Sequence, residues 1–142
     1  MILRLKQTDY AKILTHARAG LPNEACGLIA GTIDGEIKTI EKVFPMTNVD
    51  QSREHFSINP REQLAAIKEM RTNGWLPLGN FHSHPETPAR PSAEDVRLAF
   101  DAAASYLILS LAEPEPVLRA FHVENGRTSM ESVEIVGDEL TQ

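Results

Sequence analysis

The sequence contains a single cysteine, Cys26, so the chain cannot form an internal disulfide. This fits a reducing compartment. The N-terminus, MILRLKQTDYAKIL, lacks the apolar stretch and the small-residue cleavage site of a signal peptide. No run approaches the roughly 18 apolar residues that a membrane-spanning helix needs. We therefore predict a cytoplasmic protein with no membrane partner.

Basic residues are too few for a nucleic-acid-binding surface. Lysine and arginine together number 14 against 20 aspartates and glutamates, which gives a formal net charge of −6. Binding to a phosphate backbone needs a basic stripe, so we predict no nucleic-acid partner. Apolar residues make up 42% of the 142 residues, which is enough to bury a core and excludes disorder. We predict one domain over residues 1–142.

Hydrophobic patterning predicts a mixed α/β domain, in which a mostly antiparallel or mixed sheet is flanked by helices. Short apolar or alternating runs indicate strands over residues 1–7, 24–33, 36–48, 75–85, 105–112, 116–126 and 127–137. Helical patterns cover residues 8–20, 60–74 and 92 to about 102. Asp34-Gly35 and Asn125-Gly126 are hairpin turn signals.

The first helix carries two local expectations. Thr8 or Asp9 can cap its N-terminus, because short polar side chains accept hydrogen bonds from the first turn. Ala11, Leu14 and Ala17 recur at helical spacing and are expected to form its buried face.

The stretch GNFHSHPETPARPSAEDVRLAF, residues 79–100, combines two histidines with a downstream carboxylate. In a strand, His82 and His84 point to the same face, about 6.6 Å apart along the backbone, while Ser83 points the other way. If the proline-containing loop folds back, Asp95 can join them as a third metal ligand and leave a fourth position open, as in catalytic zinc sites. The alternative is an ordinary strand, loop and helix cap, since Ser92-x-x-Asp95 is also a capping pattern.

His82-Ser-His84-Pro is followed by Ser92-x-x-Asp95, with seven residues between His84 and Ser92. This resembles the pattern of the JAMM (MPN+) metalloproteases. That family also has a glutamate upstream, at the edge of an apolar strand, and LPNEACGLIAG places Glu24 in such a setting. The resemblance covers most of the chain. It implies a JAMM/MPN domain with a cytidine-deaminase-like arrangement of sheet and helices. This short form looks most like the prokaryotic members, which are similar to peptidases of ubiquitin-like sulfur-carrier proteins.

By that resemblance, His82, His84 and Asp95 would ligate Zn²⁺. Glu24 would act as general base on a zinc-bound water and then as acid toward the leaving amine. Ser92 would help to bind the water or stabilise the oxyanion. The implied function is a zinc metallopeptidase that hydrolyses a peptide or isopeptide bond at the C-terminal tail of a ubiquitin-like sulfur-carrier protein.

Two other functions remain open. One is a different metal-dependent hydrolase built on the His-x-His pair, although the other three histidines are scattered and no HExxH is present. The other is a noncatalytic MPN-type scaffold, which the presence of all five site residues disfavours. The sequence also leaves open a homo-oligomer.

Three further residues are either close in sequence to a predicted site residue or match a segment of the family. We interpret Cys26 as a small core residue in preference to a group that reaches the cleft. In the polar segment before the second helix, Asn48 and Phe56 resemble an asparagine and an aromatic residue that family members often carry there. Asn48 is a candidate for contact with the substrate or the oxyanion.

Overall fold

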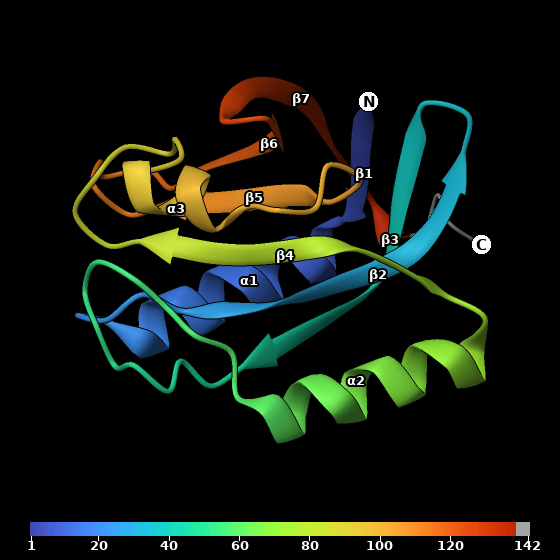
Figure 1. Cartoon of the computed structure of the whole chain (residues 1–142), viewed down its shortest axis with the longest axis horizontal. Helices are drawn as coiled ribbons and strands as arrows, with labels where there is room; N and C mark the ends of the chain where they lie inside the picture. The colour runs from blue at the N-terminus through green and yellow to red at the C-terminus, as the bar shows by residue number, and fades with distance from the viewer. Residues whose placement is uncertain (139–142) are drawn as a thin grey trace.

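Within residues 1–138, which the structure describes, seven strands close into one barrel-like sheet and three helices pack against it (Figure 1). The structure is a computed structural model. The strands are β1 (Ile2–Lys6), β2 (Cys26–Asp34), β3 (Ile37–Met46), β4 (Leu76–His84), β5 (Ser105–Ser110), β6 (Val117–Glu124) and β7 (Arg127–Val136). The helices are α1 (Gln7–Gly20), α2 (Pro60–Asn73) and α3 (Ala93–Leu98).

The strands are ordered β1-β3-β2-β4-β5-β6-β7 around the sheet. The pairs β2–β3 and β6–β7 are the predicted antiparallel hairpins, while β4–β5 is parallel and is connected through α3. β1 runs parallel to both β3 and β7, and its pairing with β7 closes the barrel. The predicted mixed sheet is confirmed. The closure of the sheet by pairing of its first and last strands was not predicted.

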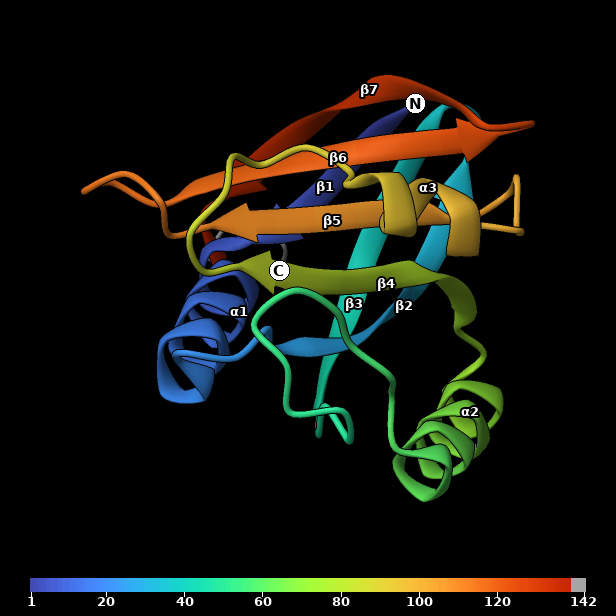
Figure 2. The ribbon, with the colours of Figure 1, turned by 60° about the vertical axis from the view of Figure 1, so that its left-hand side comes forward.

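The two faces of the sheet bury different helices (Figure 2). Ile13 and Ala17 of α1 pack with the largest core cluster, which includes Ile29 and Phe81. α2 packs its Ala66 and Met70 against the opposite face of β2 and β3. No helix in residues 1–138 is long and apolar enough to span a membrane.

The predictions for the start of α1 are wrong in two respects. Lys6 is the N-cap residue and its side chain does not cap the helix, because strand β1 runs directly into α1. The N–H of Thr8 in the first turn instead donates to Asp138 Oδ1 at 3.2 Å. Ala11 is exposed, whereas Ile13 and Ala17 are buried. The orientation of the helix is set by packing on the barrel, and a small apolar residue such as alanine is tolerated on either face.

The third helix is shorter than predicted and ends at Leu98 rather than near residue 102. Lys38 reaches the following segment, where its Nζ donates to the Ala103 carbonyl and to Ser105 Oγ, both at 2.8 Å. Asp101 Oδ1 accepts from Ala103 N at 3.0 Å. These bonds hold residues 99–104 as a loop in competition with helix.

Gly79 in β4 is predicted to be required for the β4–β5 pairing. It has φ of 151°, and a Cβ atom there would lie 1.8 Å from the Ser105 carbonyl oxygen of the neighbouring strand. Gly79→Ala should therefore lower the free energy of unfolding by more than about 3 kcal/mol in urea titrations. Gly35→Ala is the control, because Gly35 also has positive φ but would meet no atom within 4 Å. It should cost only about 1 kcal/mol, and equal losses for the two variants would contradict the steric argument.

Candidate active site

Strand β4 presents both predicted histidines on the outer face of the sheet. His82 and His84 alternate with Phe81 and Ser83, which face the core side. His82 is only 2% exposed and His84 only 3%. Two imidazoles are thus held rigidly, side by side and nearly out of water.

Asp95 reaches the histidines because the loop between β4 and α3 is anchored near both ends. Ser110 Oγ donates to the Thr87 carbonyl at 2.6 Å, and His84 Nδ1 lies 2.9 Å from the Pro88 carbonyl. Ser92 then starts α3 with a capping box: its hydroxyl accepts from Asp95 N at 3.0 Å, and its own N–H donates to Asp95 Oδ2 at 2.9 Å. The cap therefore orients the carboxylate toward the imidazoles.

The three candidate ligand atoms form a nearly equilateral triangle. His82 Nε2 lies 3.1 Å from His84 Nε2 and 3.2 Å from Asp95 Oδ2, and His84 Nε2 lies 3.1 Å from the same oxygen. Ligands about 2.0–2.1 Å from a tetrahedral metal ion are about 3.3 Å apart. Among the described residues, these three form the group of ligand atoms suited to a metal ion. The triangle fits a small divalent cation such as zinc.

The protonation of the histidines also fits a cation. His84 Nδ1 must carry a proton, because its partner, the Pro88 carbonyl, can only accept. Although burial alone would lower the pKa of His84, its hydrogen bonds to Asp95 and to the Pro88 carbonyl raise it. When Nε2 carries no proton, its lone pair points toward the Asp95 side of the triangle, which is the usual arrangement of a metal-bound histidine. Burial lowers the pKa of His82, which keeps it neutral. Although burial alone would raise the pKa of Asp95, the two imidazoles hold it well below its usual range.

Phe56 stacks on the His82 ring, with the ring centroids 4.7 Å apart and the planes 27° from parallel. His82 Nδ1 is buried and has no hydrogen-bond partner within residues 1–138. Stacking therefore takes the place of the hydrogen bond that normally orients a metal-bound imidazole. Phe56, the aromatic residue that resembles the one in the family's segment, thus contacts a candidate ligand.

Glu24 lies beside this group without belonging to it. Its side chain is 4% exposed, and Oε1 has no hydrogen-bond partner among the described residues. It interacts electrostatically with His84 and Asp95, yet it is not one of the three residues whose ligand atoms cluster within 4.8 Å in the described chain. The Glu24 carboxylate is therefore close enough to the triangle to interact with its charges.

The backbone around Glu24 is fixed by three other residues. Its N–H donates to the Ser52 carbonyl at 2.7 Å, and its carbonyl accepts from Asn48 Nδ2 at 3.0 Å. Ser83 forms two bonds to Ala25, one through its hydroxyl at 2.8 Å and one through its N–H at 2.9 Å. The serine between the two histidines therefore ties the strand that carries them to the segment that carries Glu24.

These positioning roles were not recognised in the sequence. The side chain of Asn48 also donates to the His55 carbonyl and accepts from the N–H groups of Asp50 and Ser57. The amide hydrogens and the amide oxygen of Asn48 are thus engaged within the chain, and a contact between Asn48 and substrate stays a prediction. The sequence signal for this positioning role was that Asn48 is a polar residue beside two segments that form loops.

The favoured interpretation of Cys26 as a core residue is confirmed. Its side chain is fully buried, and its Sγ lies 3.9 Å from the Met46 carbonyl. Burial raises the pKa of the thiol to about 12, so it is protonated and a poor nucleophile or metal ligand. His16 is likewise structural, with Nε2 next to the carbonyls of Cys26 and Met46.

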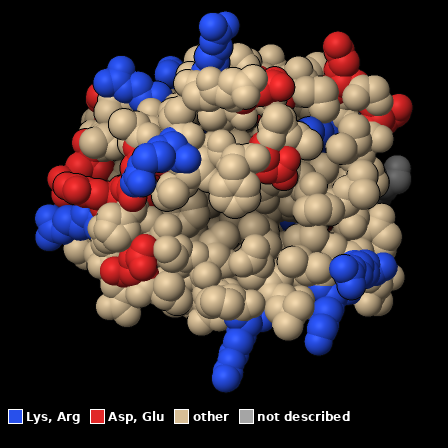
Figure 3. Space-filling model, in the orientation of Figure 1, with Lys and Arg blue, Asp and Glu red and all other residues tan. Residues whose placement is uncertain are grey.

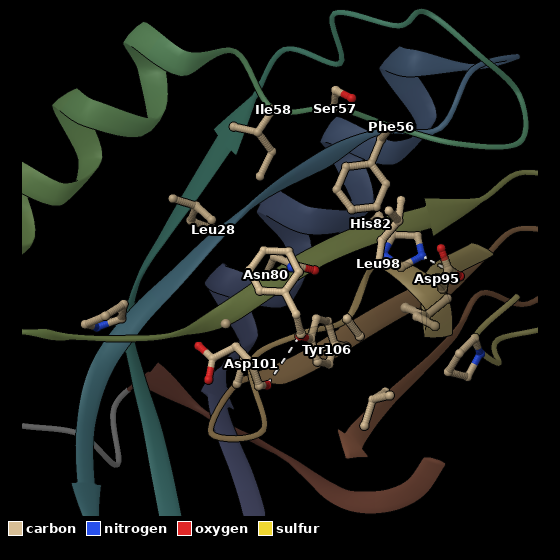
Figure 4. Close-up of a pocket in the computed structure, with 18 of the residues that line it drawn as sticks. Leu28, Phe56, Ser57, Ile58, Asn80, His82, Asp95, Leu98, Asp101 and Tyr106 are labelled. Atoms are coloured by element: carbon tan, nitrogen blue, oxygen red, sulfur yellow. Dashed lines mark hydrogen bonds and ion pairs between the residues drawn. The ribbon is translucent and has the colours of Figure 1, made fainter. Parts of the chain in front are cut away.

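A cavity of about 530 Å³ adjoins the triangle on the side of His82 and Asp95. It lies between the 55–58 segment and α2 on one side and α3 with the 99–104 loop on the other (Figure 4). The surrounding face is largely uncharged at its centre, with most charged side chains around its margin (Figure 3). Phe100, 95% exposed, stands at the border of this cavity.

Comparison with known proteins supports this arrangement at the level of sequence. Residues 6–124 match the model of the family described as prokaryotic homologs of the JAB domain. The chain is 34% identical to the CysO-cysteine peptidase of Mycobacterium tuberculosis over 125 residues, which are 87% of this chain and 84% of the relative. It is 35% identical to the desampylase of Haloferax volcanii over 103 residues, or 69% of this chain and 73% of the relative.

A solved structure agrees with the fold. The solution structure of a protein from Desulfitobacterium hafniense is 54% identical and superposes with a TM-score of 0.88 over 96% of this chain and 94% of that one. The family match and the similarity to this structure confirm the resemblance to prokaryotic JAMM/MPN proteins that the His-Ser-His-Pro and Ser-x-x-Asp motifs indicated.

Glu24 is predicted to make the metal-free protein less stable as pH rises. Burial, opposed by His84 and reinforced by Asp95, raises the pKa of Glu24 from 4.5 to about 8. The folded state therefore holds a proton that the unfolded chain releases between these pH values, and stability falls across this window. Metal-free Glu24→Gln should match the native protein at pH 5 and exceed it by about 1–3 kcal/mol at pH 8.5 in urea unfolding.

Glu54→Gln provides the matched control, since Glu54 is an exposed carboxylate of the neighbouring segment. Its pH profile should follow that of the native protein. Parallel profiles for native protein and Glu24→Gln would contradict the burial argument.

Proposed function

The chain belongs to the family of prokaryotic homologs of the JAB domain, and we propose that it is a zinc-dependent peptidase acting on ubiquitin-like carriers. Its substrate would be a peptide or isopeptide bond at the C-terminal tail of a ubiquitin-like sulfur-carrier protein. The observation that carries the proposal is the triangle of His82, His84 and Asp95, with sides of 3.1–3.2 Å, beside the buried Glu24.

His82, His84 and Asp95 would hold the zinc ion, which when bound polarises a carbonyl oxygen and lowers the pKa of a coordinated water. The two neutral imidazoles and one ionised carboxylate are the ligand forms that such an ion requires. The capping box keeps Asp95 in place, and the Phe56 ring keeps His82 in place. The ligands are therefore organised before substrate arrives.

Glu24 is the proposed general base. Its carboxylate, which interacts electrostatically with His84 and Asp95, would take a proton from the attacking water and return that proton to the leaving amine. Hydrogen bonds with Asn48, Ser52 and Ser83 fix the backbone of Glu24 and Ala25, which supports a constant position for this base. A positioned base of this kind contributes about 10²–10⁴-fold to the rate.

Ser92 is the proposed donor to the carbonyl oxygen as negative charge develops there. Its hydroxyl oxygen accepts from Asp95 N in the helix cap. No acceptor for the hydroxyl proton is recorded among residues 1–138, which leaves that proton to donate toward the substrate. The capping role and the catalytic role are compatible in one side chain.

The substrate class is supported by the relatives and by the cavity. One relative is named a CysO-cysteine peptidase and another a desampylase. The cavity beside the triangle, largely apolar in its walls, can hold an extended chain end. We infer that residues 1–142 act as one peptidase domain in the cytoplasm.

Purified protein that has never met a chelator should contain about one zinc per chain by elemental analysis, because three protein ligands suit one catalytic ion. Asp95→Asn should bind zinc at least tenfold more weakly, since the neutral amide loses the charge that faces the cation. His122→Ala removes a histidine of β6 and should leave the zinc content unchanged. Absence of bound metal from native protein produced with ample zinc would contradict the proposal.

Glu24→Gln should keep its zinc and lose about 10²–10⁴-fold in turnover, because the amide cannot take up a proton. The assay is intact mass of ubiquitin-like carriers extended at the C-terminus by one residue or joined through an isopeptide bond, with and without chelator. Glu86→Gln, which alters an exposed carboxylate of the adjacent loop, should cleave normally. Normal turnover by Glu24→Gln would show that the base is another group, and binding without cleavage by native protein would favour a scaffold.

A further inference from the structure

The segment between β3 and α2 contacts the candidate site through one side chain, Phe56. Its ring stacks on that of His82, whose Nδ1 has no hydrogen-bond partner within residues 1–138. In Figure 4, Phe56 lies beside His82, and Ser57 and Ile58 continue the same segment away from it. The orientation of the His82 imidazole therefore depends on what holds Phe56 in place.

The two residues that flank Phe56 both bind one carboxylate. Ser57 Oγ donates to Asp50 Oδ2 at 2.8 Å, and His55 Nδ1 lies 3.1 Å from the same oxygen. A carboxylate oxygen is an acceptor, so both side chains donate to it. Phe56 is thus carried on a short stretch of chain that Asp50 holds on both sides.

The backbone turns sharply to bring Asp50 into this position. Gln51 has φ of 47°, in the left-handed region, and its N–H donates to the Asn48 carbonyl at 3.2 Å. Asn48 Oδ1 accepts from Asp50 N at 3.0 Å and from Ser57 N at 3.1 Å. A left-handed non-glycine residue persists where the surrounding structure over-determines it, and such residues cluster at functional sites. The turn therefore fixes Asp50 opposite the stretch that carries Phe56.

The Asp50 carboxylate is not part of the protein core. Its side chain is 34% exposed, and that of His55 is 45% exposed. Exposed pairs of this kind contribute little to global stability. Removal of the carboxylate should therefore have its main effect on the local position of Phe56, and global unfolding should change little.

We propose that Asp50 is a positioning residue for the candidate metal ligand His82 and that it acts through Phe56. Its carboxylate holds His55 and Ser57, these hold Phe56 between them, and the Phe56 ring restrains the imidazole. The inference rests on the proposed zinc peptidase function, because the ion that His82 would hold is part of that proposal. Groups that orient a metal ligand typically change metal affinity by about 10–100-fold when they are removed.

The first test is a double-mutant cycle on zinc affinity, measured by competition with a chelator. Phe56→Leu keeps an apolar side chain without the flat ring and should weaken zinc binding by about tenfold. Asp50→Ala should weaken it by about fivefold. Because Asp50 acts through Phe56, the double variant should bind zinc within about twofold of Phe56→Leu, whereas independent effects would multiply to about fiftyfold.

Two controls separate the hydrogen bonds of Asp50 from its charge. Asp50→Asn removes the charge but keeps an oxygen that can accept from both donors, so its zinc affinity should stay within about twofold of native. Glu54→Ala removes an exposed carboxylate of the same segment and should also stay within about twofold. Ser57→Ala, which removes one of the two donors, should weaken zinc binding in the same direction as Asp50→Ala and provides a second test if Asp50→Ala folds poorly.

The second test needs no metal. The ring current of Phe56 shifts the NMR signals of the His82 Hδ2 and Hε1 protons in the metal-free protein, because the two rings are stacked. In Asp50→Ala these signals should move toward their positions in Phe56→Leu, and in Asp50→Asn they should stay at their native positions. The signals of His122 on β6 should stay the same in all variants.

Native zinc affinity in Asp50→Ala and Ser57→Ala, or losses that multiply in the double variant, would overturn the role of Asp50. Failure of the native protein to bind zinc would instead count against the proposed function. In that case the metal-free spectra decide the inference: unchanged His82 signals in Asp50→Ala would overturn it, and the expected shift would support Asp50 as the residue that positions the ring.

Discussion

Two hydrogen bonds between Ser83 and Ala25 set the position of Glu24 relative to the histidines. Ser83 lies between His82 and His84 and faces the opposite side of β4, so its hydroxyl reaches the start of β2. Both strands lie in the closed sheet, and neither can shift without breaking a ladder. The position of the segment that carries Glu24 relative to the candidate ligands is therefore set by the sheet, and a rigid scaffold of this kind suits the proposed preorganised site.

The electrostatics of the site follow from burial of acids and imidazoles close together. Asp95 stays ionised because two imidazoles and a helix-capping N–H face it. Glu24 has no such partner in the described chain, and burial raises its pKa to about 8. Two carboxylates a short distance apart thus have opposite tendencies, one suited to holding a cation and the other to moving a proton. A cation at the triangle would add to the ionised population of Glu24.

Much of the fold could be predicted because its signals are local. The Asn59 cap, the left-handed Gly74 at the end of α2 and the two hairpin turns all depend on residues within a few positions of each other. The end of α3 could not be predicted, because Lys38, far away in sequence, holds the following loop through the Ala103 carbonyl. The closure of β1 onto β7 likewise depends on pairing between the two ends of the chain, which local periodicity does not encode.

The sequence by itself determined that His82 and His84 share one face of a strand and that Ser92 and Asp95 form a helix cap, because both follow from the repeat of a single element. The sequence also contains the family pattern that identified Glu24 as a candidate site residue. Only the tertiary structure decided that Asp95 meets both imidazoles and that Ser83 and Asn48 hold the segment around Glu24. These relations join residues on different strands and loops, and they exist only once strand register and loop path are set.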